Sequence, residues 1–194
     1  MLDAAPPKNQ SVNLRIAGRV RALRAERRLS LEALAARSEV SRSMISLIER
    51  GESSPTAVVL DKLATALGVA LVTLFEDTSR PLNPLSRRED RVTWRDPASG
   101  YERCNISPEV PSPFRIVEVV MPVGARVAYE TGAREVTLQQ QVWVQEGRLE
   151  VTVGEITHAL AEDDCLAMNL NAPITFRNPD NQPTRYLVVV SSAD

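Results

Sequence analysis

The sequence predicts two domains of different fold class, an all-α bundle of five helices followed by an all-β sandwich or barrel. Apolar residues recur at helical spacing as far as about residue 76, whereas short alternating strands dominate from about residue 92 onward. The charge changes with the pattern: residues 1–80 carry 12 Lys and Arg against 9 Asp and Glu, and residues 81–194 carry 11 against 16. A chain of 194 residues has the length of two small domains.

Domain boundaries follow the composition. Residues 1–12 contain paired prolines and little apolar material, which predicts a flexible arm. Residues 13–76 are expected to form the helical domain and residues 92–194 the β domain. Between them, residues 77–91 mix proline, serine and charge without a sustained period, as linkers do.

The first helix is predicted over residues 13–28, where four apolar residues recur at helical spacing between arginines. Across residues 8–50, ten Lys and Arg stand against four Asp and Glu, a local charge of +6 that suits a polyanion. A charge run alone usually marks a solvated helix face. This charge therefore supports DNA binding only in combination with a nucleic-acid-binding motif. The four apolar residues are Leu14, Ile16, Val20 and Leu23.

Two further helices are predicted around a tight turn within residues 29–55. Ser30 can cap the first and Ser41 the second, because a serine hydroxyl accepts a hydrogen bond from the free N–H groups of a first turn. Gly51 suits the end of the second helix. Only residues 37–40 lie between the two helices, so they must cross steeply and share a small core.

A fourth helix is predicted with Ser54 as its cap and Pro55 as its first residue, ending at Gly68. Proline is favoured at the first helical position because the N–H that it lacks would have no partner there. A last turn over residues 71–76 completes the five-helix bundle.

The polar front of the helix after Ser41 has the form of an edge that enters a DNA major groove. With SRSMISLIERG following the small Ala35 and the apolar Val40, residues 14–76 resemble the XRE (Cro/C1-type) helix-turn-helix family. The resemblance implies that the second helix of the motif contacts double-stranded DNA in the major groove. One departure is Leu31, where the family often has a glutamine that holds a phosphate. The residues expected to face DNA are Ser41, Arg42, Ser43, Met44, Ser46, Leu47 and Arg50.

The second domain is predicted as short strands joined by tight turns, with Gly147 and Gly154 marking hairpins. The segments QVWVQEGRLEVTV, AEDDCLAMNLNAPITFRNP and TRYLVVV resemble the cupin family, which implies a double-stranded β-helix barrel over about residues 110–190. In prokaryotic regulators that combine both domains, the barrel is taken to sense a small molecule. The expected strands are residues 114–120, 126–130, 138–145, 148–153, 155–160, 165–170, 174–178 and 185–190.

Metal-binding cupins use histidine and glutamate ligands, but this chain has one histidine, His158, and it matches no ligand position. The family spacing places the ligand positions near Glu130 and Gly132, at Gln140 and at Ile174. A neutral amide and an aliphatic group are poor metal ligands, so we expect no metal and no cofactor. Three of these positions and the charged Arg126 are expected to line a pocket for a small-molecule effector instead. The predicted effector-binding residues are Arg126, Glu130, Gln140 and Ile174.

The sequence therefore favours a DNA-binding transcriptional regulator with a ligand-sensing barrel, not an enzyme. Two alternatives stay open: a metal-dependent cupin enzyme tethered to DNA, and a constitutive repressor whose barrel serves only dimerisation. A homodimer is expected because one bundle reads few base pairs, with the apolar strand 185–190 as an edge covered by the partner. Cys104 and Cys165 suggest no disulfide framework, and the chain shows neither a leader nor a membrane span, so the cytoplasm is the expected location.

Overall fold

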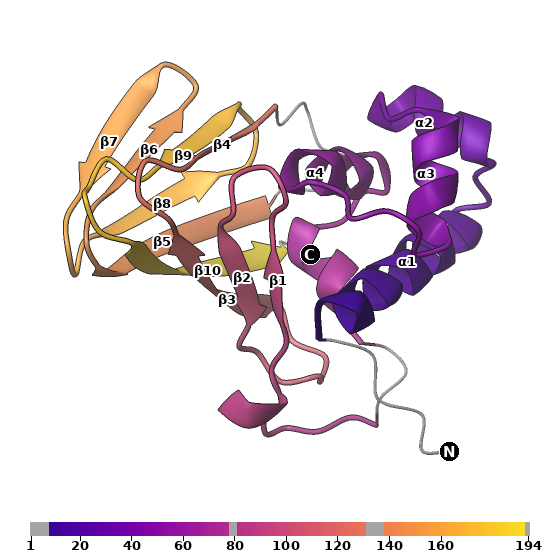
Figure 1. Cartoon of the computed structure of the whole chain (residues 1–194), viewed down its shortest axis with the longest axis horizontal. Helices are drawn as coiled ribbons and strands as arrows, with labels where there is room; N and C mark the ends of the chain where they lie inside the picture. The colour runs from indigo at the N-terminus through magenta and orange to yellow at the C-terminus, as the bar shows by residue number, and fades with distance from the viewer. Residues whose placement is uncertain (1–7, 78–80, 131–137, 193–194) are drawn as a thin grey trace.

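The computed structural model describes residues 8–77, 81–130 and 138–192. Helices occupy one end of the molecule and two β-sheets the other, and helix α4 (Ala57–Ala66) lies between the other helices and the sheets (Figure 1). No helix within these ranges is both long and apolar enough to cross a membrane.

The described part of the helical region contains four α-helices and a 3-10 helix, where five helices were predicted. The last element has the tighter 3-10 geometry because only five residues lie between the extended backbone of Ala70 and that of Glu76. The helices are α1 (Lys8–Glu26), α2 (Leu31–Ser38), α3 (Arg42–Glu49), α4 and the 3-10 helix η1 (Leu71–Phe75).

Helix α1 begins at Lys8, inside the segment that was predicted to be an arm. The reason is Val12, which is 3% exposed and extends the buried stripe of Ile16 and Val20 by one turn. Burial of this side chain stabilises helical geometry that the local composition does not favour. The arm prediction is therefore wrong from Lys8 onward, and residues 1–7 lie outside the described residues.

The caps of α2 and α3 are those predicted from the sequence. The hydroxyl oxygens of Ser30 and Ser41 each accept a hydrogen bond from the N–H three residues ahead, at 3.1 and 3.2 Å. Gly51 ends α3 with φ +70°, and a Cβ at this position would lie 2.7 Å from the Leu14 side chain. Both the backbone conformation and the packing therefore favour glycine.

The start of α4 differs from the prediction. Its cap is Thr56, not Ser54, and the Thr56 hydroxyl accepts a hydrogen bond from the first turn at 3.3 Å. Asp96 of the β region also accepts a hydrogen bond from the Ala57 N–H at 2.9 Å. Pro55 thus precedes the cap, because this tertiary contact and Thr56 together satisfy the first turn.

Within the described residues, ten strands form two antiparallel sheets. The six-stranded sheet has the order β1-β2-β3-β10-β5-β8 and the four-stranded sheet the order β4-β9-β6-β7. Inward residues of both sheets are buried, as the strict alternation of burial along β5 illustrates. The strands are β1 (Thr93–Arg95), β2 (Glu102–Asn105), β3 (Phe114–Met121), β4 (Arg126–Tyr129), β5 (Leu138–Glu146), β6 (Leu149–Val153), β7 (Ile156–Leu160), β8 (Cys165–Asn169), β9 (Ile174–Arg177) and β10 (Thr184–Ser192).

The eight predicted strands are confirmed to within two residues at each end. Strands β1 and β2 were missed because their sequences, Thr-Trp-Arg and Glu-Arg-Cys-Asn, each contain a single apolar residue and so show no alternation. Gly154 lies in a hairpin between β6 and β7, as predicted. Gly147 does not, because it joins β5 to β6, and these strands belong to different sheets.

Strand β10 lies in the middle of its sheet, paired with β3 on one side and β5 on the other. The prediction that residues 185–190 form an open edge is therefore wrong. Its run of apolar residues reflects a central strand, whose backbone groups are used on both sides. A partner cannot pair with this backbone.

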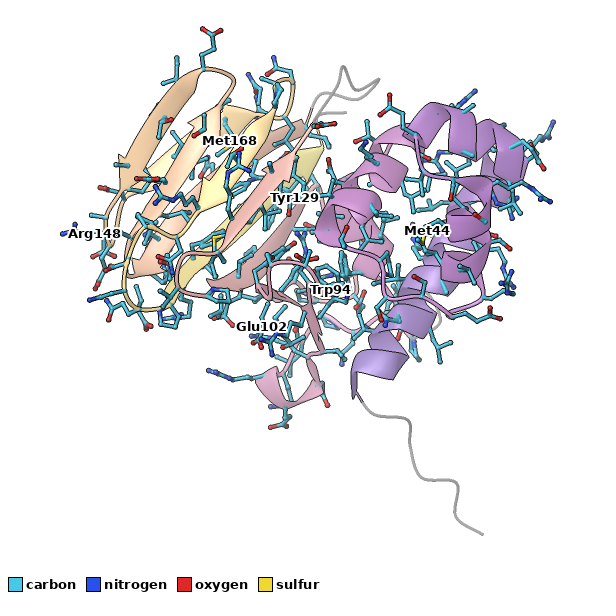
Figure 2. The ribbon with its side chains drawn as sticks, turned by 45° about the horizontal axis from the view of Figure 1, so that its top comes forward. Met44, Trp94, Glu102, Tyr129, Arg148 and Met168 are labelled. Atoms are coloured by element: carbon cyan, nitrogen blue, oxygen red, sulfur yellow. The ribbon has the colours of Figure 1, made fainter. Side chains whose placement is uncertain are left out.

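The helical and β regions share one hydrophobic core. Phe75 of η1 lies edge-on to Trp94 of β1, with ring centroids 5.4 Å apart, and Trp94 lies edge-on to Tyr101 at 5.9 Å. Helix α1 also contacts β1, and α4 contacts β4. Figure 2 shows Trp94 at the side of the sheets that faces the helices. The two regions are therefore packed against each other.

Candidate nucleic-acid interface and interior cavity

Helix α3 presents a polar front opposite its buried side. Ile45 and Ile48 are buried against the other helices. Met44, which was predicted to face DNA, packs partly against the helical core, and its sulfur accepts a hydrogen bond from the Ser53 hydroxyl at 3.7 Å (Figure 2). Of the other predicted contact residues, those exposed are Ser41, Arg42, Ser43 and Arg50, and those half-buried are Ser46 and Leu47.

Both arginines of this front are paired with carboxylates. The Nε of Arg42 lies 2.6 Å from Oε1 of Glu32 on α2. Arg50 donates from Nε and Nη2 to the two carboxylate oxygens of Glu52, at 2.8 Å each, and from Nη1 to the Ser46 hydroxyl. The hydrogen bond from Arg50 lowers the pKa of Glu52. Because the pairs are exposed, they are weak enough to exchange for phosphate or base contacts.

Arg24 belongs to the support of α3 and not to its front. Its guanidinium donates two hydrogen bonds to the carboxylate of Glu49, at 2.6 and 2.8 Å, and Glu49 is only 7% exposed. The hydrogen bond to Glu49 raises the pKa of Arg24. Arg21 donates to the Glu49 backbone carbonyl at 2.7 Å. These contacts hold α3 against α1, so part of the basic charge counted in the sequence is structural.

A cavity of about 60 Å³ lies where the sheets meet the helical region. Asp61 of α4 and Ala70, Leu71 and Val72 at η1 form one wall of this cavity, which we call the helical wall. The remaining walls come from the inner faces of both sheets and are mostly apolar. Figure 2 shows Tyr129 on the helix-facing side of the sheets. The polar residues that the sheets contribute are Tyr101, Arg103, Tyr129, Gln140 and Tyr186.

Two of the four predicted effector-binding residues line this cavity. Gln140 is 8% exposed and Ile174 is 2% exposed, and they come from opposite sheets. Arg126 points outward, because alternate residues of β4 face opposite sides of the sheet. Glu130 is exposed, and its Oε2 lies 3.8 Å from Nζ of Lys62 on α4. The last two residues are therefore not part of the cavity.

The polar groups that the sequence analysis missed come mainly from the unpredicted strand β2 and its approach. The hydroxyls of Tyr101 and Tyr129 lie 3.1 Å apart. The Arg103 guanidinium lies over the Phe75 ring, 5.1 Å from its centroid. Burial raises the pKa of all three cavity tyrosines, Tyr186 included, and the positive charge of Arg103 opposes each rise. These hydroxyls therefore stay protonated at neutral pH and can donate hydrogen bonds.

The described residues contain no group of three or more His, Cys, Asp or Glu placed to hold a metal ion. His158 lies on β7 opposite Val151 of β6. Gly132, one of the ligand positions given by the family spacing, lies outside the described residues. Cys104 and Cys165 are both free thiols, and burial raises the pKa of Cys104.

The whole arrangement recurs in a solved structure. A transcriptional regulator of the HTH_3 family from Vibrio cholerae superposes with a TM-score of 0.77 and 22% identity, covering 96% of this chain and 99% of that chain. Its fold therefore includes both the helical and the β region. The cupin domain of an XRE family transcriptional regulator from Enterobacter cloacae gives a TM-score of 0.39 and 18% identity, covering 42% of this chain and 84% of that chain.

Sequence comparison addresses the helical region. The helix-turn-helix family model matches residues 20–74. An HTH-type transcriptional regulator of Sinorhizobium fredii (strain NBRC 101917 / NGR234), y4dJ, is 45% identical over 56 residues, which is 29% of this chain and 73% of that protein. The family-model match includes α2, the turn and α3. The chain therefore belongs to the HTH_3 (XRE-type) family of helix-turn-helix transcriptional regulators.

Proposed function

We propose that this regulator reads a specific DNA sequence with α3 and that its β region, a cupin-type barrel, senses a small molecule that changes DNA affinity. The observation that carries the proposal is the shared cavity, bounded both by the sheets and by α4 and η1 of the helical region. A molecule bound there contacts both regions at once. We assign residues 13–76 to the DNA-binding domain, 77–91 to the linker and 92–194 to the sensor domain.

Helix α3 is the reading element because its exposed front matches the major groove in width and chemistry. Arg42 is the residue of this front that can donate two hydrogen bonds to O6 and N7 of guanine. Ser41, Ser43 and Ser46 offer shorter contacts to base edges or phosphate. Arg50, at the end of the helix, is close to the DNA backbone in this docking. Met44 supports the position of α3 by packing against the helical core.

Coupling between the two sites follows from the helical wall. A ligand that prefers one position of η1 also biases α3, because Arg19 of α1 donates to the Thr73 carbonyl of η1 at 3.3 Å and Arg24 ties α3 to α1. Allosteric couplings of this kind are typically about 1 to 3 kcal/mol. Linkage then requires that operator DNA change the affinity for the ligand by the same factor.

A homodimer is the second part of the proposal, through the outer face of the six-stranded sheet. Trp143 of β5 is 44% exposed on this face and lies opposite Leu187 of β10, with Val189 and Ile116 as the next apolar pair. At one end Arg185 is paired with Glu118 and Glu146. A second copy is the occupant that fits, since operator reading requires two half-sites and a two-fold axis brings like apolar patches together.

The proposal is tested in two steps with the full chain. Selection of bound sequences from a random duplex library should return a palindrome with half-sites about 34 Å apart. Titration of the selected duplex with pooled metabolites should then find a compound that shifts DNA affinity. If a bound duplex emerges but no pool shifts its affinity, the barrel serves dimerisation alone. Failure to select any duplex would remove the proposal altogether.

A further inference from the structure

We propose that the cavity takes a small monoanion, a short-chain carboxylate in the first instance, with Arg103 as its counter-charge. The inference rests on the sensor function proposed above and specifies the chemistry of its ligand. Three observations carry it: a buried cation with an unused donor, a ring of protonated hydroxyls, and the size and apolar character of the remaining wall.

Arg103 is 7% exposed, and among the described residues its Nε has no hydrogen-bond partner. No ion pair of its guanidinium is found within the described ranges. Contact with the Phe75 ring offsets part of the lost hydration, since an aromatic face attracts a cation. A buried charge without an opposite charge is nevertheless unfavourable. An anion in the cavity would supply a negative charge beside Arg103.

The hydroxyls indicate where that anion lies. Tyr101, Tyr129 and Tyr186 line the cavity, and the charge of Arg103 acts on each of them. The guanidinium is therefore close to the cavity and to the hydroxyls together. Because the tyrosines stay protonated, they donate hydrogen bonds, and a carboxylate accepts from both a guanidinium and an O–H. Gln140 adds a neutral amide donor on the same lining.

The dimensions restrict the rest of the ligand. A cavity of about 60 Å³ holds about four to six water-sized groups, at 10 to 15 Å³ each. The other lining residues of the sheets are apolar, including Met121, Ile174 and Val188. A short alkyl chain bearing one carboxylate satisfies both conditions, and n-butyrate, with roughly six non-hydrogen atoms, is a suitable probe.

A cationic ligand is less suitable despite Asp61 on the helical wall. Asp61 already has an interaction within the protein. A second hollow of about 400 Å³ lies on the side of the linker and also includes Arg103, together with Arg91, Asp90 and Glu109. Its lining also contains Arg15 and Arg87, so four arginines stand against two carboxylates and this hollow too favours an anion, and the second experiment separates the two sites. Arg91 lines only this second hollow and therefore provides a matched control.

The first experiment uses the unaltered protein and isothermal titration with n-butyrate and with butyramide, which has the same size and no charge. We expect n-butyrate to bind at least about tenfold more tightly, because a hydrogen-bonded charge pair contributes that much. Equal affinities would overturn the anion assignment while leaving a sensor cavity in place. Absence of binding by both would overturn the inference, whatever the metabolite titration gives.

The second experiment places the anion. Arg103→Met should weaken n-butyrate binding roughly ten- to hundredfold, Arg103→Lys should retain part of the affinity, and Arg91→Met should leave it unchanged. Loss of affinity in Arg91→Met with none in Arg103→Met would assign the ligand to the second hollow and contradict the proposal. Circular dichroism checks that each variant is folded. If Arg103→Met does not fold, the n-butyrate affinity of Arg103→Lys is compared with that of the unaltered protein, and equal affinities would contradict the proposal.

Discussion

The Arg42 guanidinium, the main candidate for base recognition, lies 2.6 Å from the Glu32 carboxylate of the preceding helix. Both side chains are about two-thirds exposed, at 65% and 66%, so the pair is weak and DNA can displace it. In the proposed docking, Glu32 therefore competes with guanine for Arg42 and also repels phosphate. This pair was not evident from the sequence, in which the two residues are ten positions apart.

Replacement of Glu32 by glutamine should strengthen DNA binding. Releasing an exposed ion pair should raise the affinity by up to roughly fivefold. Fluorescence anisotropy with the selected operator measures the change at fixed salt. Glu39→Gln is the matched control, because Glu39 is exposed and pairs with Lys62 instead. A larger effect in Glu39→Gln than in Glu32→Gln would contradict the competition.

Arg42→Ala and Arg50→Ala should weaken DNA binding in different ways. Loss of the Arg42 contact should cost about 1 to 3 kcal/mol at one base pair and relax the preference there. Loss of Arg50 should weaken all sequences alike and reduce the salt slope by about one unit. Affinities for a set of single-base operator variants at several salt concentrations measure both. Unchanged base preference in Arg42→Ala would mean that α3 docks differently.

Arg24→Met should destabilise the fold by about 3 kcal/mol, because it leaves the buried Glu49 carboxylate without its main partner. Urea unfolding followed by far-ultraviolet circular dichroism gives the free energy of unfolding. Arg21→Met is the control, since its side chain is 59% exposed and its closest ion-pair distance to Glu49 is 4.0 Å. Similar losses of unfolding free energy in both variants would show that the bidentate contact between Arg24 and Glu49 contributes no more than the contact of Arg21.

Asp96→Ala should loosen the helical region from the sheets. It removes the acceptor of the Ala57 N–H and of the Ser99 N–H, bonded at 2.9 and 2.8 Å, and a buried donor left unpaired costs about 1 to 3 kcal/mol. Trp94 lies where the helices meet the sheets, so its fluorescence reports on that contact. The measurement is made in a Trp143→Phe background, in which Trp94 is the remaining tryptophan. In Asp96→Ala, the Trp94 fluorescence should change at a lower urea concentration than the far-ultraviolet circular dichroism of the helices. Asp90→Ala, in the exposed 3-10 helix Arg88–Asp90, is the control. Coincident transitions in Asp96→Ala would contradict the prediction.

What the sequence could predict was set by local signals. Ser30, Ser41 and Gly51 act within one turn of the chain, so their roles were predicted correctly. At the start of α4, the Asp96 contact spans 39 positions and could not be read from spacing, whereas the Thr56 cap is local and was passed over for Ser54. For the cavity, the spacing of the cupin family located Gln140 and Ile174. Arg103 was missed because its strand reads Glu-Arg-Cys-Asn, which shows no apolar alternation.

The correction to β10 changes the expected dimer from edge pairing to face packing. A central strand offers no free backbone, but its outer side chains Leu187 and Val189 lie beside Trp143 on an apolar face. Exposed tryptophans at the centre of such faces commonly dominate the association energy.

Trp143→Asp should therefore convert a dimer into a monomer. A buried charge and a lost aromatic contact together should cost about 2 to 4 kcal/mol, a shift of the dimer dissociation constant by roughly thirty- to a thousandfold. Sedimentation velocity over a range of concentrations measures the shift, and the palindromic operator should then bind monomers without cooperativity. Ile156→Asp, at a 64% exposed position of the other sheet, should remain dimeric. A monomer in the unaltered protein at micromolar concentration would refute the dimer, and a dimer that dissociates only in Ile156→Asp would move the interface to the four-stranded sheet.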